Sequence, residues 1–259
     1  MRRTIRKDGL ALLQHSEQAQ PGFVSDAQLL GLPEPLQHYL RYAQVVGKAP
    51  IRTVRLTQQG FMRMQPGQKW LPMVAEQYFT TAPPAFLWHT TIRPFPPVSI
   101  SATDRFSDGH GTMRIKLWSA IPMGNARGPE MDQGELQRYL LEMAWFPTAW
   151  LSSAIEWQAI DDNSVKATIH QQGVTASGVL HVNEEGQLTK LTADRYREEH
   201  GHYRLDIWTA LSSEYMEVEG MRIPTRSEVT WHLAPGDFTW FRFEITEIEY
   251  NQSGKVTVL

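Results

Sequence analysis

The stretch Asn125-Ala-Arg-Gly-Pro-Glu-Met-Asp-Gln-Gly-Glu-Leu-Gln-Arg-Tyr-Leu-Leu-Glu-Met-Ala-Trp-Phe-Pro147 predicts one helix in a chain otherwise patterned as strands. Gly128 and Pro129 open the helix, because proline is preorganised for the first helical turn and needs no N–H there. Pro147 closes it, because the residue before a proline avoids the helical conformation. The rest of the fold is expected to be organised around this helix.

Two faces of the predicted helix differ in chemistry. At helical spacing, one face carries the apolar residues Leu136, Leu140 and Met143. Another face carries three carboxylates and a phenol, from Asp132, Glu135, Tyr139 and Glu142. We expect the apolar face to be buried, whereas the sequence leaves open whether the carboxylate face points inward.

Strand patterns lie on both sides of the helix. Period-two segments run from Ile51 to Ala120 and again from Ile155 to Tyr250, with turn signals such as Asp108-Gly109 between them. A flat sheet of about ten strands would be strained, so it should curl. The expected fold is mainly β (α+β): one strongly curved antiparallel sheet, or half-barrel, with N-terminal helices and the central helix covering its open side.

The first fifty residues predict short helices. Ser25 and Asp26 can cap a short helix ending at Leu30, and the segment 36–43 is amphipathic. The basic start of the chain is interpreted as a solvated terminus. We therefore expect an N-terminal extension with a short helix (1–31), a half-barrel domain (32–250) and a C-terminal tail (251–259).

Composition excludes several classes of function. A net charge of −3 offers no basic field for nucleic acid, and the absence of cysteine excludes disulfides and thiolate metal sites. No apolar window reaches the length of a membrane span and no signal peptide is apparent, so we expect a cytoplasmic protein. Serine-hydrolase and phosphate-loop motifs are absent, which predicts no cofactor. His200 and His202 beside two glutamates could bind a metal weakly, but a solvated loop is the favoured interpretation, and no metal site is predicted.

Several short motifs suggest a family. They are Leu32-Pro33, Arg41-Tyr42, Glu76–Phe79, Ala126–Leu136 running on to Trp145–Thr148, Arg195–Arg197, Gly220–Thr225 and Glu247–Tyr250. Together they cover most of the chain, and the helix motif is the most specific. With these motifs the chain resembles an uncharacterised bacterial family, a domain of unknown function, associated with the half-barrel of outer-membrane lipoprotein carriers (LolA) and of the pigment enzyme VioE. The resemblance implies the half-barrel shape and no particular activity.

A curled sheet with a helix across its mouth forms a concave face that could hold a ligand. The predicted ligand-binding residues are the aromatics Trp70, Trp88 and Trp118, the helix residues Asp132, Glu135, Tyr139 and Glu142, and the arginines Arg127, Arg195 and Arg197. Arg226 is a further predicted partner of the carboxylates, because guanidinium pairs bidentately with carboxylate. The alternative interpretation of the aromatics is an ordinary core, and the alternatives for the carboxylates are a solvated face or a structural ion-pair network.

Three functions remain open at this point. The leading hypothesis is binding of an apolar or amphipathic small molecule in the concave face, with the helix as lid. The second is a cofactor-free enzyme in which Glu135 and Tyr139 are the catalytic candidates. The third is a protein-interaction module that uses a sheet edge or an aromatic patch. The sequence does not fix the ligand or the oligomeric state.

Overall fold

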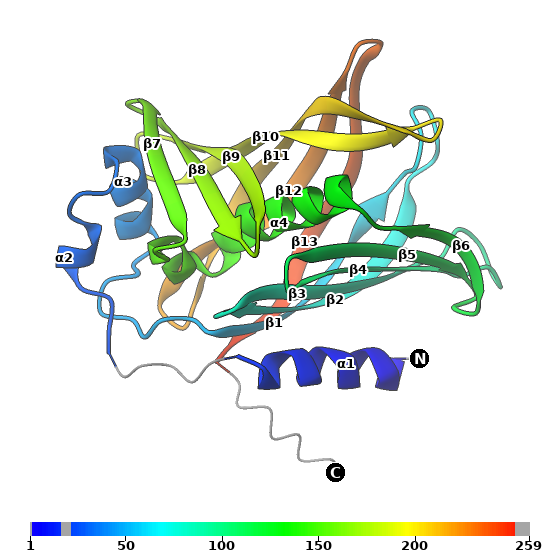
Figure 1. Cartoon of the computed structure of the whole chain (residues 1–259), viewed down its shortest axis with the longest axis horizontal. Coiled ribbons are helices and arrows are strands. Elements are labelled where there is room, and N and C mark those ends of the chain that lie inside the picture. Colours follow the sequence, from blue (N-terminus) through cyan, green and yellow to red (C-terminus); the bar gives the residue numbers. More distant parts are fainter. Residues whose placement is uncertain (1, 17–21, 252–259) are drawn as a thin grey trace.

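One curved antiparallel sheet wraps around the central helix, as the computed structural model in Figure 1 shows. The structure describes residues 2–16 and 22–251. Apart from Asn251, the predicted C-terminal tail (251–259) therefore lies outside the described residues.

The sheet has thirteen strands within the described residues, so the expectation of about ten was too low. Their bounds are β1 Thr53–Met62, β2 Leu71–Thr81, β3 Pro84–Ile92, β4 Ile100–Ser107, β5 His110–Leu117, β6 Ile121–Ala126, β7 Ile155–Asp161, β8 Ser164–Gln171, β9 Val174–Val182, β10 Leu188–Glu199, β11 His202–Val218, β12 Met221–Leu233 and β13 Gly236–Tyr250. The sequence pattern missed β6 altogether. This strand contains Pro122 and Gly124, which weaken strand signals but are tolerated at the edge of a sheet.

The strand order is β6-β5-β4-β3-β2-β1-β13-β12-β11-β10-β9-β8-β7. The chain therefore builds one meander outward from the centre (β1 to β6) and a second inward from the opposite edge (β7 to β13). The two meanders meet where β1 pairs with β13. The segment between β6 and β7 connects the two edge strands, and this segment contains the central helix.

The central helix, α4 (Pro129–Glu142), begins after Gly128 as predicted. It continues as two short 3₁₀ helices, η1 (Met143–Trp145) and η2 (Pro147–Leu151). Two glycines allow α4 to lie close to both halves of the sheet: a Cβ at Gly111 would lie 2.4 Å from the carbonyl oxygen of Met131, and a Cβ at Gly178 would lie 2.5 Å from Leu141. The helix thus spans the concave side, in contact with β4 and β5 on one half and β9 and β10 on the other.

Burial extends around more of α4 than the two-face pattern implied. Leu136 and Leu140 are buried as expected, but Glu135 and Tyr139 on the carboxylate face are buried too. The cause is the position of the helix inside the curve of the sheet, where strands face it from two sides. The carboxylate face therefore points inward.

The end of α4 is held by tyrosines from distant elements. The last carbonyls of a helical segment lack intrahelical partners. The hydroxyl of Tyr39 donates to the carbonyl of Ala144 (3.2 Å), and the hydroxyl of Tyr250 donates to that of Trp145 (2.6 Å). Trp145 also packs edge-on against Phe243, with ring centroids 5.7 Å apart. These contacts tie the helix end to the middle of the sheet.

In the part of the chain that the structure describes, three further helices precede the sheet: α1 (Arg2–Gln14), α2 (Asp26–Leu29) and α3 (Glu34–Tyr42). The sequence predicted the last two but not α1, which packs against β2 and β3. There Gly9 lies so close to Tyr78 that an added Cβ would stand 2.3 Å from the ring. None of the helices in the described residues is long and apolar enough to cross a membrane.

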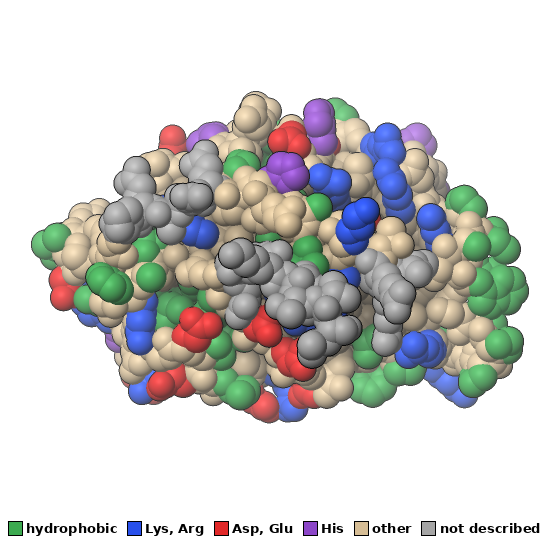
Figure 2. Space-filling model, turned by 90° about the horizontal axis from the view of Figure 1, so that it is seen from below, with side chains coloured by type: hydrophobic (Ala, Val, Ile, Leu, Met, Phe, Trp, Pro, Cys, Tyr) green, Lys and Arg blue, Asp and Glu red, His purple; other side chains and the backbone are tan. Residues whose placement is uncertain are grey.

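Hydrophobic side chains are unevenly distributed on the surface. Figure 2 shows them gathered, with basic side chains around them, at the end of the molecule where β4, β5 and β6 lie in Figure 1. Acidic side chains lie mainly towards the other end and along the lower rim in this view.

Candidate functional site

A buried ionic cluster lies between α4 and the sheet. The pairing register places Gln77 (β2), Trp88 (β3) and Asp104 (β4) side by side in one row across three strands. All three side chains are buried. They meet charged residues of α4, because β4 and β3 are among the strands that the helix contacts.

Arg138 of α4 is the centre of this cluster. Its Nη1 donates to Oδ2 of Asp104 at 2.7 Å, and its Nε donates to Oε1 of Glu142 at 2.9 Å. The guanidinium also lies over the ring of Trp88, 4.6 Å from the ring centroid. Nε2 of Gln77 donates to the second oxygen of Glu142 at 2.7 Å. One arginine thus joins two carboxylates from different elements.

Arg195 of β10 approaches from the opposite half of the sheet. Its Nη2 donates to the carbonyl of Gly134 at 3.0 Å, and its guanidinium lies over the ring of Trp208 at 5.2 Å. Four buried polar atoms of the cluster have no hydrogen-bond partner among the described residues: Oε1 of Gln77, Oδ1 of Asp104, Oε2 of Glu135 and Nε of Arg195. Buried polar groups are rarely left unpaired, so these atoms mark an incompletely satisfied site.

The cluster holds three carboxyl groups and two guanidiniums, so its charges do not balance if every group is ionised. Burial, followed by the negative charge of Asp104, raises the pKa of Glu135 to about 8. Burial also raises the pKa of Asp104 and of Glu142, although Arg138 opposes both shifts. With a pKa of about 8, Glu135 is mostly protonated at neutral pH, which reduces the excess of negative charge in the cluster.

Of the arginines predicted to pair with the carboxylates of α4, one lies in this cluster and the others lie elsewhere. Arg195 reaches the cluster, whereas Arg197 pairs with Asp206 and Glu199, and Arg226 pairs with Glu214 and Glu244. Arg127 is exposed ahead of α4. The principal partner, Arg138, was not among the predicted arginines. Arg138 precedes Glu142 by four residues, a spacing that predicts an ion pair on one face of a helix.

The other predicted binding residues are dispersed. Asp132 accepts a hydrogen bond from the backbone N–H of Gly111 (2.7 Å), which fastens the start of α4 to β5. Trp88 lies in the cluster, but Trp118 is exposed. The guanidiniums of Arg63 and Arg242 lie over the ring of Trp70, 4.6 Å and 4.8 Å from its centroid. No group of three or more His, Asp or Glu side chains suited to a metal ion is found in residues 2–16 and 22–251.

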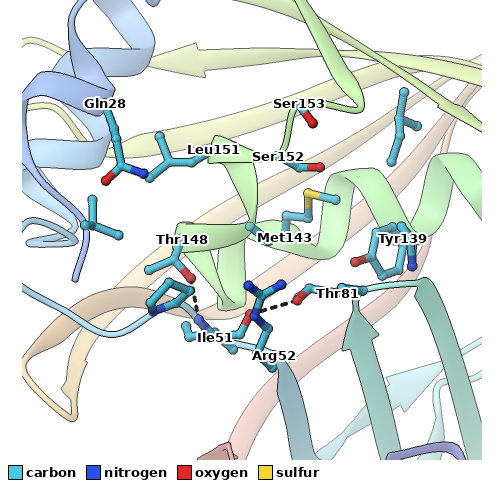
Figure 3. A pocket seen from close by; sticks show the side chains of 16 residues that line it. Gln28, Ile51, Arg52, Thr81, Tyr139, Met143, Thr148, Leu151, Ser152 and Ser153 are labelled. Atoms are coloured by element: carbon cyan, nitrogen blue, oxygen red, sulfur yellow. Dashed lines mark hydrogen bonds between the residues drawn. The ribbon is translucent and has the colours of Figure 1, made fainter. Parts of the chain in front are cut away.

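A pocket of about 310 Å³ lies at the C-terminal end of α4. Its walls come from α2, the segment leading into β1, the β2–β3 turn and η2, which are far apart in the sequence. The lining residues are Val24, Gln28, Pro50, Ile51, Arg52, Thr81, Ala82, Pro84, Tyr139, Met143, Thr148, Ala149, Leu151, Ser152, Ser153 and Ile169 (Figure 3). The lining therefore combines apolar surface with a few polar groups.

Two interactions fix the floor of this pocket. The hydroxyl of Thr148 accepts a hydrogen bond from the backbone N–H of Ile51 (2.9 Å), and the hydroxyl of Thr81 donates to the carbonyl of Ile51 (2.9 Å). Figure 3 shows the guanidinium of Arg52 extending from this floor towards Met143. Nε of Arg52 is buried without a hydrogen-bond partner among the described residues.

Tyr139, a predicted site residue, lines this pocket rather than the ionic cluster. Its hydroxyl donates to the carbonyl of Thr80 at 3.0 Å, and burial raises its pKa far above the ordinary range. Glu135 and Tyr139 therefore belong to different environments although they lie one helical turn apart. Sequence reasoning did not identify Arg52, because nothing in its neighbourhood distinguishes it from the other arginines.

Solved structures that match this chain share little sequence with it. A LolA superfamily protein from Nitrosomonas europaea is 12% identical, with 85% of this chain and 93% of that chain covered at a TM-score of 0.43. An outer membrane lipoprotein-sorting protein domain from Vibrio parahaemolyticus, described as putative, is 8% identical over 78% and 86% of the two chains, at a TM-score of 0.42. No curated protein shows significant similarity to the chain. Residues 22–243 match the model of a family of unknown function, DUF6544, and the chain belongs to that family.

Proposed function

We propose that the protein binds a small amphipathic molecule with an anionic head group in the pocket at the end of α4. The observation that carries this proposal is Arg52, whose Nε is buried, unpartnered and directed into the pocket. A buried unpaired donor is costly, and an arginine is well suited to a carboxylate or phosphate, which it contacts through two parallel hydrogen bonds. Binding of an anionic group would satisfy this donor.

The shape of the pocket supports a small ligand. Its volume of about 310 Å³ lies at the lower end of the range of roughly 300–1,000 Å³ for ligand sites. Met143, Leu151 and Ile169 offer apolar surface for a short chain. The sequence predicted binding in the concave face, with the helix as lid. Because α4 occupies the middle of that face, the proposed binding site lies at the end of the helix. The cytoplasmic location inferred from the sequence remains part of the proposal.

Calorimetric titration with decanoate, decanol and decylamine tests the chemistry of the head group. We expect saturable binding of decanoate and much weaker binding of the neutral and cationic chains. Arg52→Gln should weaken decanoate binding roughly 10- to 100-fold, because a hydrogen bond to a charged group contributes about 1.5–3 kcal/mol. Ser153→Trp, which places a large side chain at the exposed rim, should block the pocket. The matched control is Arg105→Gln, on an exposed part of β4.

Equal affinity for decanoate, decanol and decylamine would contradict the proposed anionic head group. Decanoate binding that survives both Arg52→Gln and Ser153→Trp would show that the pocket is not the binding site. Loss of binding in Arg105→Gln as well would indicate a general charge effect. Circular dichroism of each variant confirms that the fold is retained.

A second candidate function is acid–base catalysis without a cofactor, favoured by one specific observation at Glu135. This carboxyl is held protonated at neutral pH and has a buried oxygen without a partner. Such a group can donate a proton to a substrate atom near pH 7. A screen with esters, lactones and enolisable ketones should then reveal a turnover that Glu135→Gln abolishes. A turnover equal in wild type and Glu135→Gln would eliminate this role, and Tyr139→Phe tests the tyrosine in the same way.

A further inference from the structure

Three connections of the first meander lie together at one end of the sheet. They are residues 63–70 between β1 and β2, 93–99 between β3 and β4, and 118–120 between β5 and β6. Alternate connections of an antiparallel meander fall at the same end, and these strands are neighbours in the sheet. We call this region, with the adjoining strand ends, the basic end. It is opposite the pocket, which lies at the start of β1 and the β2–β3 turn.

The connections that form the basic end contain basic residues and no acidic ones. Residues 57–75, 90–103 and 113–125 contain no aspartate or glutamate, although the whole chain has a net charge of −3. They contain Arg63, Lys69, Arg93, Arg114 and Lys116. Apart from Arg63, all of these are exposed, and none forms a salt bridge within the described residues. The neighbouring β12–β13 hairpin adds one acid, Asp237, which pairs with His232.

Large hydrophobic side chains are exposed at the same end. Each of six is between 50% and 63% exposed: Phe61, Met64, Phe95, Trp118, Ile121 and Met123. Single exposed hydrophobic residues are common, but a group of them framed by basic residues marks an interaction surface. Figure 2 shows this gathering of hydrophobic and basic side chains at the right-hand end of the molecule.

A hydrogen bond links two of the connections that bear these hydrophobic residues, and a hollow lies next to it. The indole N–H of Trp118 donates to the carbonyl of Pro97 at 3.2 Å, which joins two of the three connections. A hollow of about 250 Å³ next to this bond is lined by Arg93, Pro96, Pro97, Val98 and Ser99. Arg93 and Ser99 offer a cation and a hydroxyl there, and both groups bind phosphate oxygens.

We propose that the basic end docks on the surface of an anionic lipid bilayer. Trp118, Phe95 and Ile121 would enter the boundary between head groups and acyl chains, where aromatic and aliphatic side chains are favoured. Arg93 and Lys116 would contact lipid phosphates, and the hollow beside Arg93 would receive one head group. Aliphatic side chains such as Ile121 and Met123 do not stack on bases, which argues for lipid over nucleic acid.

Vesicle co-sedimentation tests this proposal directly. The full chain is mixed with vesicles of phosphatidylcholine alone, or with 30% phosphatidylserine added, at low and high salt. We expect binding to the anionic vesicles only, and weaker binding at high salt because exposed charges are screened. Arg93→Gln/Lys116→Gln should reduce the partition coefficient by roughly 10-fold or more, since each basic residue near an anionic surface contributes about fivefold. Phe95→Ser/Met123→Ser should reduce binding even at low salt.

Matched controls replace residues of the same kind elsewhere. Arg41→Gln/Arg105→Gln removes two exposed arginines, and Leu30→Ser removes an exposed hydrophobic residue. Both should bind vesicles like the wild type, as should Arg52→Gln at the opposite end, so this test is independent of the proposed pocket. Equal binding to neutral vesicles, no binding to anionic ones, or unchanged binding of both basic-end variants would overturn the proposal. Tighter binding to a single-stranded oligonucleotide than to anionic vesicles would assign the surface to nucleic acid instead.

Discussion

Replacing Glu135 by glutamine should change how the stability of the protein depends on pH. Glutamine has nearly the shape of a protonated glutamate but cannot ionise. Glu135 is buried among Asp104, Arg138, Glu142 and Arg195, and its pKa is about 8 in the folded chain. The unfolded chain leaves this carboxyl in water, where its pKa is about 4.5.

The sign follows from proton binding. Between pH 4.5 and 8 the folded protein holds a proton on Glu135 that the unfolded chain has released. The free energy of unfolding therefore falls as pH rises, by about 1.4 kcal/mol per pH unit from this group alone. Below pH 4.5 both states are protonated, and above pH 8 both are ionised, so the slope vanishes. Between pH 5.5 and 8 the loss amounts to roughly 3 kcal/mol.

Urea unfolding followed by tryptophan fluorescence at pH values from 5.5 to 9 measures this effect. The stability of wild type minus that of Glu135→Gln should decrease with pH and level off above pH 8. The difference between the two proteins is the useful quantity, because burial also raises the pKa of Asp104 and of Glu142. Glu184→Gln is the control, since Glu184 is exposed and should leave the pH dependence unaltered.

Parallel curves for wild type and Glu135→Gln would refute the reasoning, because they would show that Glu135 has the same pKa in both states. A difference that increased with pH would be equally decisive, since it would mean that the folded protein favours the ionised carboxylate.

Three further substitutions examine the buried cluster, the pairing of β1 with β13 and the end of α4. Arg138→Met should destabilise the protein by about 3–5 kcal/mol, because two buried carboxylates lose their partner; a loss below 1 kcal/mol in urea unfolding would show that the cluster is solvated. Gly60→Ala should disturb the β1–β13 pairing, since its Cβ would lie 2.1 Å from the carbonyl oxygen of Arg242; unchanged amide exchange in β1 would contradict this. Tyr250→Phe should lower stability by about 1–3 kcal/mol because the buried carbonyl of Trp145 loses its donor; an unchanged thermal midpoint would count against it.

The sequence predicted the features that local patterns encode. The start of α4 at Gly128-Pro129, the hairpin around Asp108-Gly109 and the inward alternation of the strands all depend on neighbouring residues, and all appear in the structure. The missed strand β6 shows the limit of this reasoning. Its proline and glycine oppose strand formation locally, and only pairing with β5 stabilises it.

The candidate site was less accessible to sequence reasoning because it is assembled from distant elements. Glu135, Glu142 and Arg195 lie close together in the structure, and the need of buried carboxylates for nearby cations was the sequence signal for this group. The contribution of Asp104 depends on the register of β4 against β3, which no local pattern sets. Arg52 could not be distinguished either, because its importance comes from a pocket formed by α2, η2 and the β2–β3 turn.

The pairing of β1 with β13 has a consequence for how the chain folds. Each meander can form from contacts between sequence neighbours, whereas the seam between them joins Val54 to Tyr250, about 200 positions apart, and such distant pairing is slow to form. The same seam brings the first and last strands side by side at the centre of the molecule. We therefore expect closure of this seam to be the slowest step of folding, after each meander has formed from its own local contacts.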